Sequence, residues 1–192
     1  MKRIIFDKLK ESIEIKDRFI RNSIDLILES VDMISACLVS GHKLLIFGNG
    51  GSAADAQHMA AEFINRFQMD RSPLAAIALT TDTSIITSIG NDHSFDEIFS
   101  KQIKAIGKKD DIAIAISTSG NSKNVLQGVY QAKDIGIHTI GLTGSGSILA
   151  EYVDLAFCVD SGITPRIQEA HQALEHILCD LVERSLFSNP TG

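Results

Sequence analysis

Residues 117–122, Ser-Thr-Ser-Gly-Asn-Ser, place four hydroxyl side chains between a short apolar run and a segment with helical periodicity. The backbone N–H groups and the dipole at the beginning of a helix favour an anion there, and hydroxyls add donors without adding charge. Serine, threonine and asparagine are also the usual helix-capping residues, but a cap accounts for one of them rather than for four. We therefore interpret this segment as a phosphate-binding loop that uses Ser117, Thr118, Ser119 and Ser122.

A second loop, Gly-Asn-Gly-Gly-Ser at residues 48–52, also separates a short apolar run from a helical pattern. Its three glycines lack Cβ atoms, which permits the backbone to approach a ligand closely. The loop is not a dinucleotide-binding G-x-G-x-x-G motif, because Ala53 stands in place of the third glycine. It also lacks the Gly-Lys-Ser/Thr sequence of a P-loop. Nucleotide binding is therefore disfavoured.

The helical segment after the glycine-rich loop carries His58 and Glu62, whose spacing of four residues puts them side by side on one face. Such a pair suits two ligands of one metal or an acid–base pair, but spacing alone favours a simple hydrogen bond on a helix surface. Many of the neighbouring residues are alanines, so this helix is thin and can lie close to the sheet. That feature favours a functional site.

The last helical segment is rich in polar side chains of the same kinds. At about 100° per residue, Glu169, Gln172 and His176 share the tightest face, while Gln168 lies about 80° around from His176. A second pair at i and i+4 is formed by His171 and Glu175. Periodicity alone does not decide which of these residues face a site.

Strands and helices alternate along the part of the chain that carries these motifs. Short apolar runs bounded by glycine or polar residues are typical of strands in a parallel sheet covered on both faces. They predict strands at residues 44–47, 74–79, 112–116, 137–142 and 155–159, and helical patterns predict helices near 53–68, 84–105, 122–135, 146–151 and 164–187. This alternation predicts a doubly wound parallel α/β sheet, in which ligands bind beyond the carboxyl ends of the strands.

The first forty residues repeat apolar side chains at helical spacing and predict two helices ahead of the first strand. These helices either cap the core or pack on a partner subunit. We interpret residues 1–192 as one domain, with N-terminal helices over 1–40, an α/β core over 41–187 and a tail over 188–192.

Composition narrows the class of protein. Among 192 residues, 44% are hydrophobic and 22% charged, as in a globular domain and unlike a disordered chain. The net charge of −6 and the absence of a Lys/Arg cluster argue against a nucleic-acid partner. Three widely spaced cysteines, a charged N-terminus and apolar runs too short to span a bilayer predict a cytoplasmic protein without a membrane segment.

Taken in order, these motifs resemble those of the bacterial phosphoheptose isomerases, which have the sugar isomerase (SIS) fold. The resemblance covers nearly the whole chain and rests on Gly48-Asn49-Gly50-Gly51-Ser52, Asp55-Ala56-Gln57-His58-x-x-x-Glu62, Asn65-Arg66-Phe67, Gly90-Asn91-Asp92, residues 117–122 and Arg166-Ile167-Gln168-Glu169. It implies a three-layer α/β/α sandwich with a five-stranded parallel sheet, which is a flavodoxin-like arrangement. It also implies a homotetramer with active sites between subunits.

The resemblance further implies one Zn²⁺ per subunit, held by the positions that match His58, Glu62, Gln168 and His176. The resemblance thus implies Gln168 as the ligand, whereas the helical spacing from His176 favours Glu169. The implied reaction converts sedoheptulose 7-phosphate into D-glycero-D-manno-heptose 7-phosphate, which opens the ADP-heptose route to lipopolysaccharide core and surface glycans.

The residue types suit this chemistry. Aldose–ketose isomerisation moves a proton between C1 and C2 through a cis-enediol, and Glu62 and His176 are the candidates for the proton transfers. A bound Zn²⁺ would polarise the carbonyl as a Lewis acid. The hydroxyl loop would hold the phosphate, and the sugar chain would be contacted by Asn49, Gly50, Gly51, Glu62, Asn91, Asp92 and Gln168.

Two other classes share the fold. A relative, the DnaA-initiator-associating protein, is a tetrameric regulator of replication initiation that lacks the carboxylate matching Glu62 and the histidine matching His176; both residues are present here. A sugar-phosphate-sensing SIS domain is usually fused to a DNA-binding module, and this sequence has none. Some family members carry an acidic residue where this chain has Pro165, so any role of that acid is not transferred.

Overall fold

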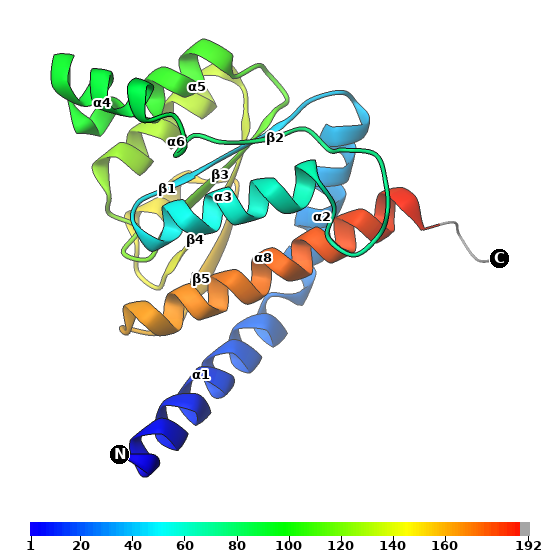
Figure 1. Cartoon of the computed structure of the whole chain (residues 1–192), viewed down its shortest axis with the longest axis vertical. Coiled ribbons are helices and arrows are strands. Elements are labelled where there is room, and N and C mark those ends of the chain that lie inside the picture. Colours follow the sequence, from blue (N-terminus) through cyan, green and yellow to red (C-terminus); the bar gives the residue numbers. More distant parts are fainter. Residues whose placement is uncertain (189–192) are drawn as a thin grey trace.

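A computed structural model describes residues 1–188 and shows a parallel sheet between two layers of helices (Figure 1). The five strands within that range are β1 (Leu44–Gly48), β2 (Ala76–Ala78), β3 (Ile112–Ser117), β4 (His138–Gly144) and β5 (Leu155–Val159). All pairings are parallel, in the order β2-β1-β3-β4-β5. The predicted fold class is therefore confirmed; the strand predicted over 155–159 has those bounds, and the other four predicted strands are present with one or both ends shifted.

The helices are α1 (Lys2–Asn22), α2 (Ile24–Val39), α3 (Gly51–Ile64), α4 (Thr83–Asp92), the 3₁₀ turn η1 (Phe95–Glu97), α5 (Ser100–Ile106), α6 (Lys123–Ile135), α7 (Ile148–Tyr152) and α8 (Thr164–Phe187). The single helix predicted over 84–105 is wrong. The backbone leaves helical geometry at His93, and the Ser94 hydroxyl accepts a hydrogen bond from Asp96 N at 3.1 Å, which starts η1. The helix predicted over 53–68 ends earlier, at Ile64.

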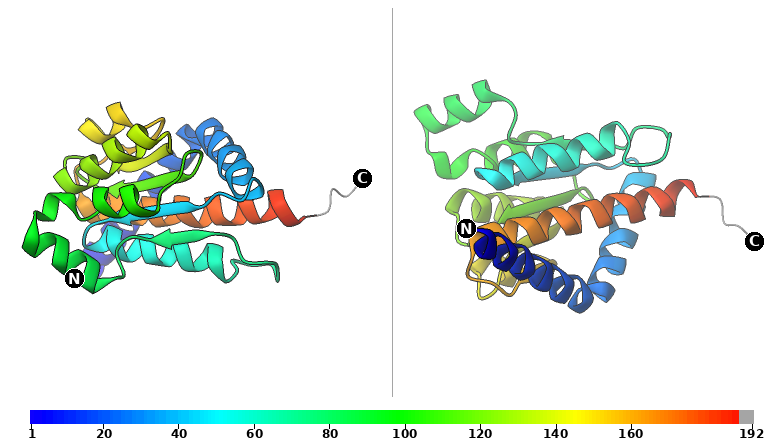
Figure 2. Two further views of the ribbon diagram at one scale, coloured as in Figure 1. Left: turned by 90° about the horizontal axis from the view of Figure 1, so that it is seen from above. Right: turned by 60° about the horizontal axis from the view of Figure 1, so that its bottom comes forward.

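Alternate side chains of the strands face opposite layers. Leu44 and Ile46 of β1 pack in one core with α1, α2, α3 and α8, whereas Leu45 and Phe47 pack in the other with α5, α6 and α7. Within the first layer, α8 lies between α3 and the two N-terminal helices, as the right view of Figure 2 shows.

The strand order determines where a site can form. The chain passes from β1 to β2 on one side of β1, whereas β3 and β4 follow on the other side. The loops after β1 and β3 therefore leave the sheet next to each other while their helices, α3 and α6, cover opposite faces. Such a switch point in a doubly wound sheet opens a crevice at the carboxyl ends of the strands.

The N-terminal helices differ in how much of them is covered. Helix α2 buries Ile27, Val31 and Ile34 in the core, whereas α1 extends away from the sheet with most of its side chains exposed (Figure 1). No helix within residues 1–188 combines the length and the apolar character that crossing a membrane requires. Of the predicted tail over 188–192, residues 189–192 lie outside the described part of the chain.

Candidate active site

A polar cavity of about 100 Å³ lies at the switch point of the sheet. It is lined by Asn49, Ser52, Ile116, Ser117, Thr118, Ser119, Ser122 and Gln168. The two loops singled out in the sequence thus meet in one cavity, and α8 contributes a side chain to it. None of the lining residues in the described structure is charged, so an anion in the cavity would be held by hydrogen bonds rather than by ion pairs.

The loop of residues 117–122 begins α6, a helix of 13 residues. Its N-cap is Ser122, and within the described chain the hydroxyl of Ser122 does not cap the helix but lies 3.3 Å from the Ser117 hydroxyl. Gly120 has a φ of +62°, and a Cβ atom there would overlap Ser147. The loop is therefore tightly turned. Ser122 stands at the N-cap position but does not cap the helix with its hydroxyl, so capping does not explain why a serine is present there.

The glycine-rich loop approaches α8 closely. A Cβ atom at Gly51 would overlap the amide nitrogen of Gln168, so the missing side chain is what lets Gln168 reach the cavity. Asn49 exchanges two hydrogen bonds of 2.8 Å with Asn124 of α6, which ties the loop after β1 to the helix after β3. Gly50, with a φ of +57°, makes the turn that leads from Asn49 into α3.

We expect Gly51→Ala to impair activity without much loss of stability. The added methyl group must displace the end of Gln168, which is a flexible side chain, so the cost to folding is small. A misplacement of about 1 Å in a site costs up to about 100-fold in rate, and we expect kcat/KM to fall by about 10- to 100-fold. Gly162→Ala is the matched control, because a Cβ atom there meets no described atom within 4 Å; equal kcat/KM in the two variants would contradict this role of Gly51.

The imidazole and carboxylate groups predicted from α3 and α8 lie together. The Nε2 atoms of His58 and His176 are 2.9 Å apart, and His58 Nε2 is 3.6 Å from Glu62 Oε1. His58 is half exposed and Glu62 is about one-fifth exposed, at 50% and 22% of their side chains. Within residues 1–188, no three His, Cys, Asp or Glu side chains are arranged so that they would hold a metal as they stand.

The same two helices also carry buried ionisable side chains. Asp55 of α3 accepts a hydrogen bond from Gln172 of α8 at 3.0 Å, and its pKa is raised, chiefly by burial. Burial, together with the charge of Asp55, raises the pKa of Glu175 to about 8. Neither oxygen of Glu175 has a hydrogen-bond partner among the described residues. His171 is also buried, which lowers its pKa to about 4.

Of the predicted substrate contacts, Gly50, Gly51 and Glu62 lie on α3 or the loop before it without lining the cavity, whereas Asn91 and Asp92 lie on α4. Asn91 and Asp92 are exposed at the end of α4, where the Asn91 amide donates to the Asp92 carboxylate at 2.8 Å. Helix α4 projects from the upper left of the molecule in Figure 1 and buries none of its side chains. Within this subunit, therefore, the structure does not bring these two residues to the other site residues.

Of the alternatives on α8, Gln168 lines the cavity and Glu169 does not. Glu169 instead accepts hydrogen bonds from Ser12 of α1 at 2.5 Å and from Arg166 at 2.7 Å. Ser52 was not among the predicted contacts, although it lies in a quoted motif and is buried in the cavity wall. Its position, directly after two glycines and at the beginning of α3, is a signal that could have identified it.

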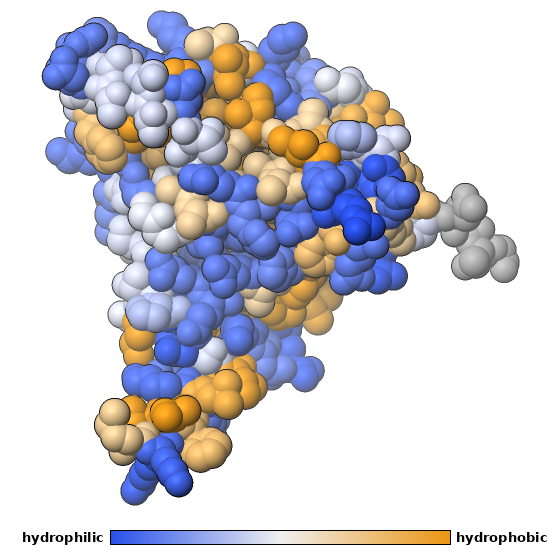
Figure 3. All heavy atoms as spheres, viewed as in Figure 1, coloured by the Kyte–Doolittle hydropathy of each residue, from blue (hydrophilic) through white to orange (hydrophobic). Residues whose placement is uncertain are grey.

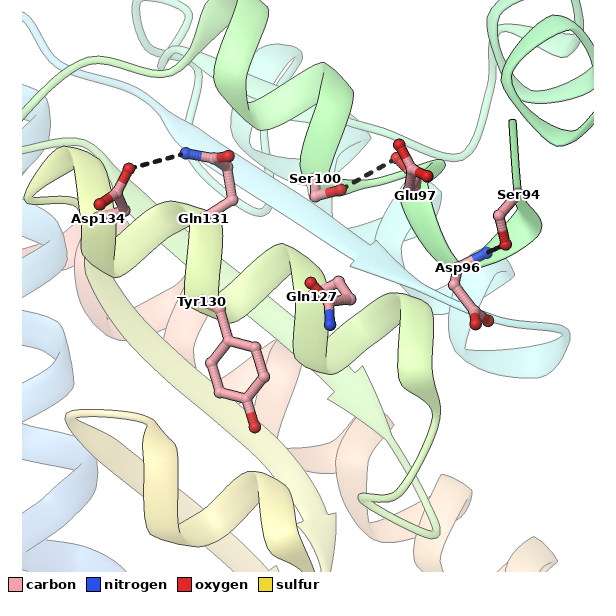
Figure 4. A pocket seen from close by; sticks show the side chains of 8 residues that line it. All are labelled: Ser94, Asp96, Glu97, Ser100, Gln127, Tyr130, Gln131 and Asp134. Atoms are coloured by element: carbon pink, nitrogen blue, oxygen red, sulfur yellow. Dashed lines mark hydrogen bonds between the residues drawn. The ribbon is translucent and has the colours of Figure 1, made fainter. Parts of the chain in front are cut away.

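A larger hollow, of about 700 Å³, lies on the other side of the sheet between η1, α5 and α6 (Figure 4). It is lined by Ser94, Asp96, Glu97, Ser100, Gln127, Tyr130, Gln131 and Asp134. It contains none of the predicted site residues, and its three carboxylates would repel a phosphate. The smaller cavity at the switch point is therefore the better candidate for the active site.

Comparison with known proteins identifies the family of this chain. The model of the SIS domain family matches residues 9–144. A phosphoheptose isomerase of Nitratidesulfovibrio vulgaris is 49% identical over 98% of this chain and 91% of its own length. Another, of Thermodesulfovibrio yellowstonii, is 51% identical over 98% and 96%.

Solved structures of the same kind are also similar. A phosphoheptose isomerase from Neisseria gonorrhoeae superimposes with a TM-score of 0.90 at 41% identity, over 95% of this chain and 98% of that one. The enzyme from Francisella tularensis gives a TM-score of 0.91 at 38% identity, over 95% and 97%. Fold, length and sequence thus agree along almost the entire chain.

Proposed function

Because this chain belongs to the SIS domain family, among its phosphoheptose isomerases, we propose that it converts sedoheptulose 7-phosphate into D-glycero-D-manno-heptose 7-phosphate at the cavity between α3, α6 and α8. The observation that carries the proposal is the pairing of an uncharged hydroxyl cavity with the His58–Glu62–His176 group on the adjoining helices. The comparisons give no support to the alternative of a regulatory protein that associates with the replication initiator.

The phosphate occupies the loop at the beginning of α6. Ser117, Ser119 and Ser122 offer hydroxyl donors there, and the first turn of the helix offers backbone N–H groups and a positive dipole end. Thr118 contributes a further hydroxyl to the same wall. A phosphate held in this way needs no basic residue, which suits a chain of net charge −6.

The reactive end of the sugar lies along α3. At 1.5 Å per residue, His58 is about 10 Å along the helix from Gly51, and an extended seven-carbon chain with a terminal phosphate spans a comparable length. The phosphate in the serine loop would therefore bring C1 and C2 to Glu62 and His176. Gln168 lines the path between the two ends.

Glu62 and His176 carry out the proton transfers. One of them removes the proton from C1 of the ketose and returns a proton to C2, and the other moves a proton between the oxygens on C1 and C2. Glu62 is partly buried, with 22% of its side chain exposed, so its carboxylate lies close to the protein surface.

The donor types on these helices suit a zinc ion, and three of the four proposed ligands, His58, Glu62 and His176, lie together. Two imidazole nitrogens bound to one zinc stand about 3.3 Å apart, given Zn–N bonds of about 2.0–2.1 Å in a tetrahedron. The 2.9 Å between His58 and His176 is close to that value, so small side-chain rotations would open the position. We propose that His58, Glu62, Gln168 and His176 hold one Zn²⁺ per subunit. When bound, the ion would polarise the substrate carbonyl and stabilise negative charge on the enediolate oxygens.

We expect His58→Ala to reduce zinc content from about one equivalent per chain to well below one-half. Removal of one nitrogen ligand from a site that includes a weak amide ligand leaves too few donors to retain the ion. Elemental analysis after dialysis against trace zinc measures the effect without reference to activity. His138→Ala removes an exposed histidine at the beginning of β4 and is the control. Full zinc content in the His58 variant would exclude it from the ligand set.

The exposed face of α1 supports assembly into a homotetramer. It carries Ile4, Ile5, Phe6, Leu9 and Ile13, each more than half exposed, and their apolar surface is visible near the N-terminal end of the molecule in Figure 3. Such a continuous apolar face on a soluble-type α/β domain marks an interface. In a tetramer with shared sites, Asn91 and Asp92 on the projecting α4 would belong to a site completed by another subunit.

The proposed phosphate site is tested by asking whether the substrate must carry a phosphate group. We expect purified protein to isomerise sedoheptulose 7-phosphate and to leave unphosphorylated sedoheptulose unchanged at the same concentration. Inorganic phosphate should compete with the phosphorylated substrate. Equal turnover of both sugars would show that the hydroxyl cavity is not the substrate-binding site.

A further inference from the structure

The loop that follows α3 is held by a buried carboxylate of α8. Glu183 is 1% exposed and accepts hydrogen bonds from the backbone N–H groups of Phe67, Gln68 and Met69 at 3.1, 2.7 and 2.9 Å. Arg71 adds a fourth, from Nε to Glu183 Oε1 at 2.9 Å, and the two side chains form an ion pair that is almost completely buried. We call this group, Glu183 with Arg71 and the three N–H groups, the Glu183 clasp.

Arg71 also reaches the part of α3 that carries Glu62. Its Nη2 donates to the carbonyl oxygen of Glu62 at 2.8 Å, and its Nη1 donates to that of Phe63 at 2.7 Å. Carbonyl groups in the last turn of a helix lack partners within the helix. The guanidinium therefore fixes the backbone of the last turn of α3, and with it the position from which the Glu62 side chain extends.

The same loop contacts the other member of the proton-transfer pair. The ring of Phe67 lies 5.6 Å from the His176 ring, with 36° between the planes. Phe67 is held there by its backbone bond to Glu183. His176 and Glu183 are seven residues apart on α8, or about two turns, so they lie on the same face of that helix.

From these contacts we propose that the Glu183 clasp positions the two proton-transfer groups relative to each other. Arg71 fixes Glu62 through its backbone, and Phe67 fixes the ring of His176. This inference rests on the proposed function, because it assigns Arg71, Phe67 and Glu183 as positioning residues for that reaction. None of the three lines the cavity, so their loss affects the rate of the chemical step rather than the binding of the phosphate.

Two substitutions separate positioning from folding. Arg71→Lys keeps a positive charge beside Glu183, but a single ammonium group cannot also reach the carbonyls of Glu62 and Phe63 in the same geometry. Phe67→Leu leaves the clasp intact and removes the ring from His176. We expect each to lower kcat by about 10- to 100-fold, with KM within about twofold of the wild-type value. Phe67→Tyr retains the ring and should keep kcat near the wild-type value.

Two controls account for stability and for ion pairs in general. Ile34→Val removes one buried methyl group from α2 and lowers the stability of the fold modestly, at a position outside the loop. Arg184→Lys alters an exposed pair with Asp180, on the same helix as Glu183. The free energy of unfolding is measured for every variant, and both controls should keep wild-type kcat.

The outcomes are distinct. A fall in kcat at constant KM in Arg71→Lys and Phe67→Leu, with Phe67→Tyr and the controls unaffected, supports the inference. A kcat within twofold of wild type in both variants overturns it, as does a loss of activity that follows the loss of folded protein in all variants and in Ile34→Val. If wild-type protein itself does not convert sedoheptulose 7-phosphate, the proposed function fails rather than the clasp. Amide hydrogen exchange at residues 67–69 then still reports whether the loop opens in Arg71→Lys.

Discussion

Glu62→Gln and His176→Gln are each expected to lower kcat for sedoheptulose 7-phosphate by about 10²- to 10⁴-fold, which is the usual contribution of one general acid or base. Both substitutions keep the approximate size of the side chain and remove the group that would accept and donate the proton. Since neither residue lines the phosphate cavity, the affinity for inorganic phosphate should remain unchanged. Kinetics of the purified variants, beside a phosphate-competition measurement, give both values.

The comparison needs variants that fold and assemble as the wild-type protein does. Circular dichroism and sedimentation establish this for each, and Arg184→Lys on α8 serves as a substitution far from the proton-transfer pair. Near-normal turnover in a correctly assembled Glu62→Gln or His176→Gln protein would remove that residue from the mechanism. A parallel rise in the dissociation constant of phosphate would instead indicate a general disturbance of the cavity.

Glu175→Gln is expected to make the stability of the protein less dependent on pH. Burial, with the nearby charge of Asp55, raises the pKa of Glu175 from 4.5 to about 8. The folded protein therefore retains a proton that the unfolded chain releases above about pH 4.5. The resulting stability is fully present below pH 4.5 and is lost as the pH rises through about 8.

The measurement is best made in chelator between pH 6.5 and pH 8. Below pH 6.5 the unfolded chain takes up a proton on His171, whereas burial lowers the pKa of His171 to about 4 in the folded protein, so stability also falls as the pH falls. Across this window the wild-type free energy of unfolding should fall by about 2 kcal/mol because of Glu175, at about 1.4 kcal/mol per pH unit. Urea denaturation of the Glu175→Gln protein should show most of that fall removed. An unchanged slope would mean that Glu175 is ionised in the folded protein at pH 7.

The fold was largely predictable because each buried strand is a short, continuous apolar run. The pattern did not show that the helix predicted over 84–105 is interrupted at His93. Apolar residues continue on both sides of His93, and only the N-cap formed by Ser94 separates α4 from η1. The order of the strands was also not deducible from the runs themselves. That order is what places the loops of residues 48–52 and 117–122 in one cavity.

The candidate site was also predictable only where its residues are close in the sequence. The spacing of His58 and Glu62 along one helix is local and could be read directly, whereas the contact of His58 with His176 joins residues that are 118 positions apart. Helical periodicity favoured Glu169 over Gln168, but it could not anticipate that Ser12 of α1 and Arg166 would engage Glu169. The Glu183 clasp joins segments more than 110 residues apart and leaves no local signal in the sequence.

Turnover of sedoheptulose 7-phosphate by the purified wild-type protein, with zinc added and with zinc chelated, tests the central claim most directly. We predict that the aldoheptose 7-phosphate accumulates in the presence of zinc and that chelation slows its formation. Folded, assembled protein that forms none of this product in either condition would contradict the assignment of the cavity as an isomerase site.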